Sequence, residues 1–214
     1  VLQTRRALKR LLRRWPGSVV VMEAGTHSPW VSRLVEELGH PSLVANPRRL
    51  PLIYRSRQKS DSRDAQRLAR LARMDVALLS PIEHRGEQAQ LQLMLVRSRD
   101  ALVRNRTQLI NHIRGTVKSF GARLPSGISA TAFGHKATDH LPEALRPVLE
   151  EMVVLVARIT EQIQRFEEEI ERWVEAHPEA KVLMAVPGVG PLTAMAFVLT
   201  LEDPHRFRRS REAG

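Results

Sequence analysis

The amino-acid sequence predicts an α/β unit with parallel strands, then a long antiparallel helical coiled-coil hairpin, then the start of a small helical domain. Short apolar runs that alternate with helical segments near the N-terminus predict the α/β unit. Two later stretches, with apolar residues at alternating spacings of three and four, predict the hairpin. The predicted domains cover residues 1–80, 85–176 and 178–214.

The first domain is predicted to run helix, strand, helix, strand, helix. Residues 18–24 and 42–45 are apolar and β-branched without alternation, which is typical of strands buried on both faces of a parallel sheet. Helical periodicity and turn residues predict helices over residues 4–15, 30–38 and 61–74, and a basic segment 48–57 that starts as a helix.

The period changes after residue 85. Residues 88–120 contain no proline and repeat leucine every seven residues, which predicts one long amphipathic helix. Residues 121–139 predict a loop, and residues 145–173 keep a heptad pattern for about four repeats. Each helix needs a cover for its apolar face, which is the other helix or another subunit.

Positive charge is concentrated near the N-terminus. The net charge is +11, and residues 1–74 contain 16 Lys and Arg against 5 Asp and Glu, whereas the remainder is balanced at 18 and 18. Such a surface attracts polyanions, of which nucleic acid is the commonest, although it also serves for solubility. Aromatic residues make up only 4% of the chain, which argues against binding single strands by base stacking.

The chain contains no cysteine, which excludes disulfides and thiolate metal sites. No apolar run approaches the roughly 20 residues of a membrane-spanning helix. No apolar signal-peptide core follows the basic N-terminus. We therefore expect a cytoplasmic location and no membrane partner.

Three acidic residues stand within this basic region. Glu23 ends the first predicted strand, at the sheet edge where parallel α/β folds place ligands. Asp61 and Asp64 are three residues apart at a helix start, so they share a face. Carboxylates on a cationic surface suit Mg²⁺-dependent chemistry on a phosphodiester. The alternative is that Glu23 is merely solvated and that both aspartates only favour the helix N-terminus.

Several residues are candidates for phosphate contacts. Lys59 and Arg63 flank the aspartates, and Arg48 and Arg49 follow the second predicted strand. Gly188 and Gly190, in Pro187-Gly188-Val189-Gly190-Pro191, resemble the hairpin of a helix-hairpin-helix module, whose backbone N–H groups approach a DNA phosphate. An ordinary turn explains these two glycines about as well.

Four motifs in order carry a resemblance to a known family: Met22-Glu23-Ala24-Gly25, Val44-Ala45-Asn46-Pro47-Arg48-Arg49, Lys59-Ser60-Asp61-Ser62-Arg63-Asp64-Ala65, and, after two long helices, Val186-Pro187-Gly188-Val189-Gly190-Pro191. Over nearly its whole length the chain resembles insertion-sequence transposases of the IS-one-ten type. The resemblance implies a RuvC-like N-terminal domain with a D-E-D-D metal tetrad, a coiled-coil region and a C-terminal transposase domain with a nucleophilic serine. It further implies a DNA recombinase that is directed by a structured guide RNA.

By position, the resemblance makes Glu23 the second member of the metal tetrad and Asp61 and Asp64 the third and fourth, with Mg²⁺ as the cofactor. Residues 1–22 contain no acid to act as the first member, and Ser210 comes too early to be the nucleophilic serine. We therefore expect an internal piece of a transposase that binds nucleic acid and catalyses poorly or not at all.

The expected partners are DNA, a structured guide RNA and a second copy of the chain bound through the helical hairpin. Two alternatives stay open. The first is a non-catalytic coiled-coil module that binds nucleic acid, whose stability Mg²⁺ should not alter. The second is a RuvC-like nuclease, which should cleave four-way DNA junctions without RNA.

Overall fold

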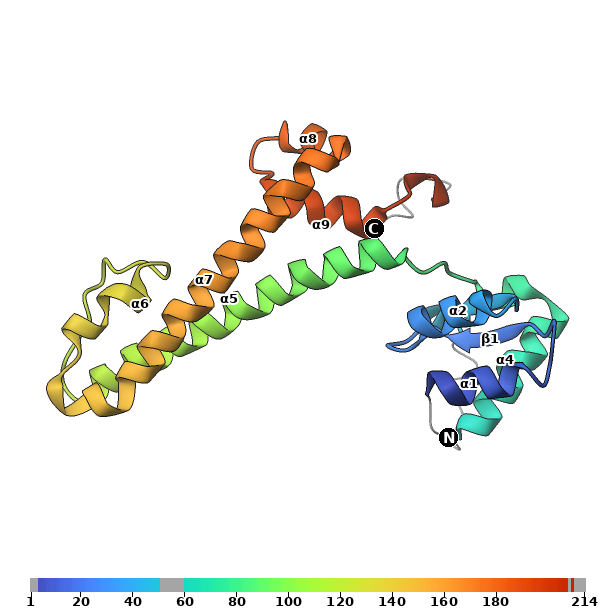
Figure 1. The fold of residues 1–214 in the computed structure, drawn as a ribbon, viewed down its shortest axis with the longest axis horizontal. Coiled ribbons are helices and arrows are strands. Elements are labelled where there is room, and N and C mark those ends of the chain that lie inside the picture. The colour runs from blue at the N-terminus through green and yellow to red at the C-terminus, as the bar shows by residue number, and fades with distance from the viewer. Residues whose placement is uncertain (1–3, 51–59, 208, 210–214) are drawn as a thin grey trace. The chain divides into compact units, whose positions relative to one another are not determined.

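A computed structural model describes residues 4–50, 60–207 and 209. The chain forms two compact units, residues Val1–Arg85 and Gly86–Gly214, and each is described by itself (Figure 1). The first unit is a small α/β layer structure and the second is helical. The predicted order of an α/β segment followed by long helices is confirmed.

The first unit contains a parallel pair of strands, β1 (Val20–Glu23) and β2 (Ser42–Ala45). Helix α2 (Ser28–Glu37) connects the two strands, and helix α1 (Arg5–Leu12) precedes them. After β2 come a 3₁₀ turn, η1 (Pro47–Arg49), helix α4 (Asp61–Met74) and a second 3₁₀ turn, η2 (Val76–Leu79). The later part of the predicted basic segment 48–57 lies outside the described residues.

The sheet separates two helical layers. Val21, Leu43 and Ala45 pack in one cluster with Leu68 of α4, so α4 covers this face. Met22 faces the opposite side and lines a hollow with Leu8 of α1 and Val31 of α2. The strands are therefore covered on both faces, as the unbroken apolar runs predict.

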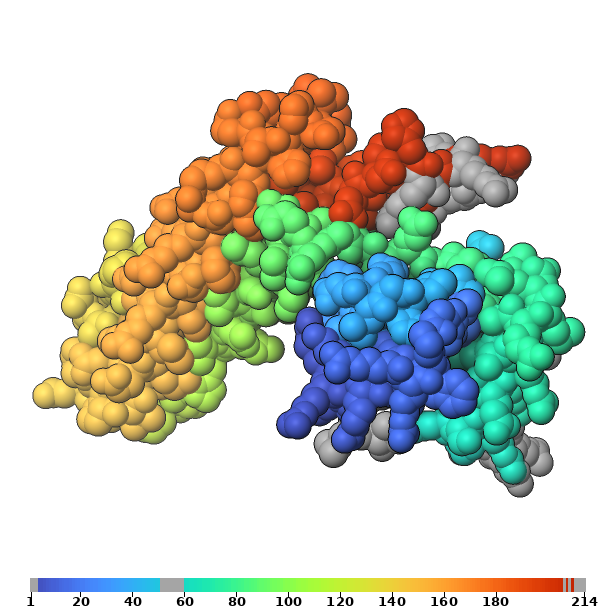
Figure 2. All heavy atoms as spheres, turned by 45° about the vertical axis from the view of Figure 1, so that its right-hand side comes forward, coloured from blue at the N-terminus to red at the C-terminus, as the bar shows by residue number. Residues whose placement is uncertain are grey.

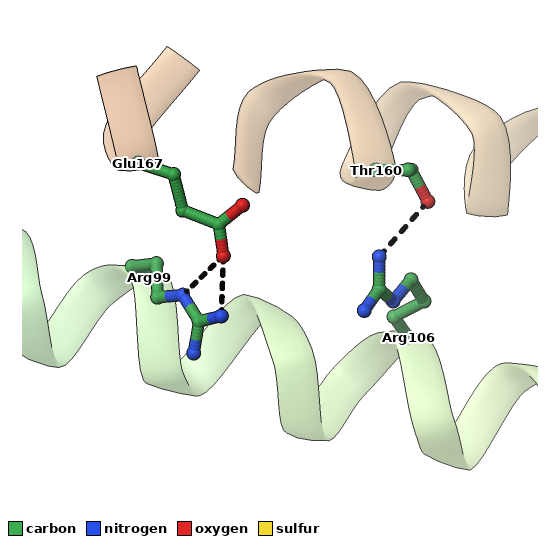
Figure 3. A network of polar contacts seen from close by, with 4 residues as sticks. All are labelled: Arg99, Arg106, Thr160 and Glu167. Atoms are coloured by element: carbon green, nitrogen blue, oxygen red, sulfur yellow. Dashed lines mark hydrogen bonds and ion pairs between the residues drawn. The ribbon is translucent and has the colours of Figure 1, made fainter. Parts of the chain in front are cut away.

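The second unit is built on two long helices, α5 (Glu87–Ser119) and α7 (Arg146–Ala176). Figure 1 shows them side by side, and the pairing of early α5 with late α7 makes them antiparallel. The Nε atom of Arg99 donates a 3.0 Å hydrogen bond to Oε1 of Glu167, and Arg106 contacts Thr160 about two turns further along (Figure 3).

The buried face of α7 differs in part from the predicted heptad seam. One predicted row is buried as expected, namely Leu149, Val156, Ile163 and Ile170. The second predicted row, which includes Met152 and Ile159, is only half-buried, and Val153 and Thr160 on the other side of the first row are buried instead. The contact face is thus rotated about the helix axis, because the segment that follows α5 also packs on α7.

The segment predicted as a loop, residues 121–139, contains a short helix, α6 (Phe133–Lys136), followed by a 3₁₀ turn, η3 (Thr138–His140). Phe133 is fully buried in the main core of this unit with Leu149 and Val153. A further 3₁₀ turn, η4 (Glu143–Leu145), leads into α7. Four residues are too few for a recognisable helical period, so the sequence pattern does not reveal α6.

The C-terminal helices α8 (Pro178–Met184) and α9 (Pro191–Leu201) pack against the ends of the long helices, and a last 3₁₀ turn, η5 (Pro204–Arg206), follows them. Met195 and Leu199 of α9 are buried with Leu93 of α5 and Ile170 of α7. The carboxylate of Glu202 accepts a 3.0 Å hydrogen bond from the backbone N–H of Gly86 at the start of α5. A separate domain over residues 178–214 stays a prediction. Within the described residues, no helix has the length and apolar character needed to cross a membrane.

Arg106 is a charged residue inside the α5–α7 interface, and only 9% of its surface is exposed. Its Nη1 atom donates a 3.4 Å hydrogen bond to the Thr160 hydroxyl, and its Nε atom is buried with no hydrogen-bond partner among the described residues. Burial lowers the pKa of Arg106, nearby Glu167 opposes that shift, and Arg99 adds to it. The guanidinium is therefore incompletely compensated for its lost hydration.

We predict that Arg106→Met raises the free energy of unfolding by about 1 kcal/mol, because an apolar side chain of similar length removes a buried charge. Urea denaturation followed by circular dichroism measures the change. The control is Arg104→Met on the same helix, where the exposed side chain pairs with Asp100, and its effect is expected to stay within about 0.5 kcal/mol. A destabilised Arg106→Met variant would contradict this account.

Candidate metal centre and nucleic-acid interface

Glu23 is the last residue of β1 and is exposed. It pairs in register with Ala45 of β2, and Val21 pairs with Leu43. The exposed side chain of Glu23 lines the hollow that Leu8 of α1 and Met22 of β1 also border. Glu23 thus stands at the carboxyl end of the parallel strands, as predicted.

Asp61 and Asp64 occupy the first turn of α4. The hydroxyl of Ser60 caps this helix by accepting a 3.3 Å hydrogen bond from the N–H of Arg63, which is the local reason that the helix begins here. Asp64 is half-buried and forms a 3.6 Å ion pair with Arg67, while Asp61 is exposed. The predicted helix boundaries, 61–74, agree with the structure.

The two aspartates lie on the helix stripe that packs against the sheet. Positions 61, 64, 68 and 71 follow spacings of three and four, so Asp61 and Asp64 continue the line of Leu68 and Leu71. Leu68 and Leu71 belong to the cluster that contains Val21. Asp61 and Asp64 therefore continue the stripe of α4 that packs on the sheet, whereas Glu23, at the end of β1, lines the hollow with Leu8 and Met22.

These carboxylates do not form a closed metal site. In the described parts of the chain, no three acidic or histidine side chains are positioned to hold a metal ion. The donor chemistry nevertheless fits Mg²⁺, which prefers one or two carboxylates together with water and substrate phosphate oxygens over an all-protein cage. The assignment of Glu23, Asp61 and Asp64 as metal ligands stays a prediction.

The predicted basic contacts surround the same unit. Arg48 and Arg49 are exposed in η1, where the Asn46 side chain accepts a 3.1 Å hydrogen bond from the Arg48 N–H. Arg63 is exposed on α4, next to the aspartates. Lys59 lies outside the described residues. The exposed guanidinium groups are accessible to phosphate, although phosphate binding itself stays a prediction.

Positive charge also affects a histidine in this unit. Burial lowers the pKa of His84, and the positive charges of Arg33 and Arg85 lower it further. Its Nε2 atom is buried and has no hydrogen-bond partner among the described residues. His84 is therefore neutral at pH 7 and adds nothing to the positive charge of the unit.

Gly188 and Gly190 form the connection between α8 and α9. The N–H of Val189 donates a 3.1 Å hydrogen bond to the carbonyl of Val186, and Gly188 has a φ of +88°, so residues 186–189 form a type II turn with Pro187 and Gly188 at its centre. Gly190 is the N-cap of α9 and has no capping side chain. The backbone thus joins two helices through a tight turn, and both the helix-hairpin-helix assignment and DNA binding by this turn stay predictions.

The predicted contact residues omit a cationic surface of the first unit. Six basic side chains of α1 and the turn after it line a shallow hollow of about 760 Å³: Arg5, Arg6, Lys9, Arg10, Arg13 and Arg14. The signal was present in the sequence as basic residues on one half of an amphipathic helix. These basic residues match no binding motif of fixed spacing, because charge alone does not specify the geometry of a ligand.

Two family profiles match parts of this chain. The family profile of DEDD transposases of the IS110 type matches residues 3–121, which include Glu23, Asp61 and Asp64. A second profile, described as the transposase IS116/IS110/IS902 family, matches residues 180–214. This chain belongs to the IS110 family of transposases. The matched regions correspond to the α/β unit with α5 and to the α8–α9 segment.

Individual IS110-family relatives align along almost the whole chain. A protein of Sinorhizobium fredii named as a predicted transposase is 30% identical over 98% of this chain and 54% of its own length. A predicted family 20 transposase of Pseudomonas aeruginosa is 32% identical over 97% of this chain and 64% of its own length. The transposase for insertion sequence element IS1111A of Coxiella burnetii is 28% identical over 92% of this chain and 54% of its own length. The chain thus spans between about half and two thirds of these relatives.

Proposed function

We propose that this chain is part of a DNA transposase of an insertion sequence, a recombinase whose α/β unit is an incomplete RuvC-like catalytic domain. The observation that supports the proposal is the position of Glu23 at the carboxyl end of β1, and of Asp61 and Asp64 on the first turn of α4, in the unit with the excess positive charge. Membership of the IS110 family supports the same reaction class.

In this proposal, Glu23, Asp61 and Asp64 hold Mg²⁺. When bound, the ion supplies Lewis-acid activation of a phosphodiester. Asp61 and Asp64 hold their carboxylates on one side of α4, and the Ser60 cap keeps that first turn in helical form. Arg63 and the exposed Arg48 and Arg49 bind backbone phosphates and thereby position the DNA.

Two further partners belong to the proposal. A structured guide RNA binds the same cationic unit, and the turn with Gly188 and Gly190 contacts a DNA phosphate at the N-terminus of α9. A second copy of the chain packs on the α5–α7 pair as a coiled coil. That contact is supported by a half-open hollow of about 470 Å³ that includes Leu102 and Leu109 of α5 and Met152, Leu155 and Ile159 of α7.

Binding of Mn²⁺ as a spectroscopic substitute for Mg²⁺ tests the metal site. We expect Asp61→Asn with Asp64→Asn to weaken Mn²⁺ binding by at least about tenfold, because two of three charged ligands are lost. Titration followed by electron paramagnetic resonance measures the free ion. The matched control, Glu161→Gln with Glu168→Gln, removes two exposed carboxylates of α7 and is expected to bind Mn²⁺ like the unaltered chain.

A strand-exchange assay with donor DNA, target DNA and guide RNA tests the reaction itself. If Mn²⁺ binds equally to the unaltered chain and to the double variant, Asp61 and Asp64 are not ligands. The chain is then better described as a non-catalytic nucleic-acid-binding module, which the lack of a closed three-ligand group in the described residues favours. Cleavage of four-way junctions without RNA would instead indicate a junction-resolving nuclease.

A further inference from the structure

In helix α1 and the turn after it, the basic side chains and the apolar side chains lie on opposite halves of the helix circumference. At about 100° per residue, the six cations from Arg5 to Arg14 occupy one half of the helix circumference. The other half consists of Ala7, Leu8, Leu11, Leu12 and Trp15. Leu12 is buried and Leu8 lines a hollow with Met22, while Leu11 and Trp15 are exposed, so part of the apolar half is already used within the unit. A membrane surface would need that apolar half to be free.

The cationic half of α1 has no internal compensation. All six basic residues are exposed, and within the described residues none of them forms an ion pair. Residues 1–3 and 51–59, which belong to the first unit and which the structure does not describe, contain no acid. The Arg5 guanidinium lies over the Trp30 ring, 5.7 Å from its centroid.

This charge arrangement is unfavourable for an isolated helix. Pairs such as Arg6 with Arg10 and Lys9 with Arg13 place like charges four residues apart, which destabilises a helix. Arg5 and Arg6 also lie at the positive end of the helix dipole, and the first turn contains no acid to offset them. A bound polyanion relieves both effects at once.

The dimensions match duplex DNA. Six cations lie along about 13 Å of helix, at a rise of about 1.5 Å per residue. A DNA duplex has one phosphate charge per about 1.7 Å of its axis, or about eight charges over the same length. The set contains only Arg and Lys, without the Asn or Gln that pairs with adenine, so the contacts suit the sugar-phosphate backbone more than base edges. Figure 2 shows the dark-blue side chains of α1 projecting from the surface of the first unit.

We propose that the cationic face of α1, formed by Arg5, Arg6, Lys9, Arg10, Arg13 and Arg14, binds the phosphate backbone of duplex DNA without sequence preference. This inference rests on the proposed function and adds to it a surface that holds DNA independently of the acidic residues. The six cations line a hollow of their own, and none of them lines the hollow that Leu8 shares with Glu23, so this surface is distinct from the acidic residues.

The salt dependence of DNA binding tests the proposal. Fluorescence anisotropy of a labelled duplex of about 25 base pairs gives the association constant between 50 and 300 mM salt. The triple variant Arg6→Gln, Arg10→Gln, Arg13→Gln is expected to lower the slope of log K against log salt by about 2.7, or about 0.9 for each lost phosphate contact. Its affinity at 0.1 M salt is expected to fall on the order of 100-fold. Glutamine keeps the helix propensity, and circular dichroism checks the fold.

Two controls separate the proposal from a general charge effect. The triple Arg→Lys variant at the same positions keeps the charge and should keep the slope. The variant Arg123→Gln, Lys136→Gln, Arg158→Gln removes three exposed cations of the second unit and should also keep it. An equal loss of slope in that control, or an unchanged slope in the α1 variant, would overturn the proposal.

Binding of three other polyanions is measured in the same way. If hairpin RNA, single-stranded DNA or anionic phosphatidylserine vesicles depend on the α1 cations while duplex DNA does not, the proposal is wrong. The α1 variant leaves the acidic residues intact, so its Mn²⁺ binding is expected to be unchanged. A failed metal site therefore does not imply a failed DNA surface, and the two proposals are distinguishable.

Discussion

Replacement of Gly134 by alanine is expected to destabilise the helical unit by about 3 kcal/mol. A Cβ atom at Gly134 would lie 2.5 Å from both the Cα and the N of Ala157 in α7. These are backbone atoms of a long helix, so they cannot move aside as a side chain can, and overpacking of this kind costs several kcal/mol. Urea denaturation followed by circular dichroism at 222 nm, a standard wavelength for helices, measures the loss.

Gly115 provides the matched control for Gly134. It lies within α5, and a Cβ atom added there meets nothing within 4 Å. Gly115→Ala is therefore expected to stabilise the chain by about 0.5–1 kcal/mol, since alanine loses less backbone entropy than glycine in a helix. If both variants changed stability in the same direction, the close approach of α6 to α7 would not be what Gly134 provides.

Replacement of Met195 by alanine is expected to cost about 3 kcal/mol and to loosen the attachment of α9. Met195 is fully buried in the cluster that joins α9 to α5 and α7, so truncation removes apolar contacts and leaves a cavity. Hydrogen exchange of the α9 amides, compared with those of central α5, should show the loss first in α9.

Phe197 is the control on the same helix. Its side chain is 51% exposed, and Phe197→Ala is expected to change stability by no more than about 0.5 kcal/mol. Because α9 begins at Gly190, a loosened α9 should also disturb the turn that contains Gly188. Equal protection of α9 in Met195→Ala and in the unaltered chain would contradict the role of Met195 in attaching this helix.

The candidate site was predictable in its parts. Asp61 and Asp64 are three residues apart after Ser60, a favoured N-cap, so their common helix face follows from spacing alone. Glu23 ends an unbroken apolar run, which places it at the carboxyl edge of a parallel sheet. Whether these side chains gather at one interface depends on which sheet face α4 covers, and local pattern does not contain that information.

The sequence by itself determined the order of elements, the parallel pairing expected of β1 and β2, and the long helices α5 and α7. Local periodicity and turn chemistry are sufficient for these features, because they depend on neighbours in the chain. Only the tertiary structure decided which side of α7 is buried, that α6 forms within an apparent loop, and that Arg106 is enclosed. Those outcomes depend on contacts such as Gly134 with Ala157, between residues far apart in sequence, where packing overrides the local pattern.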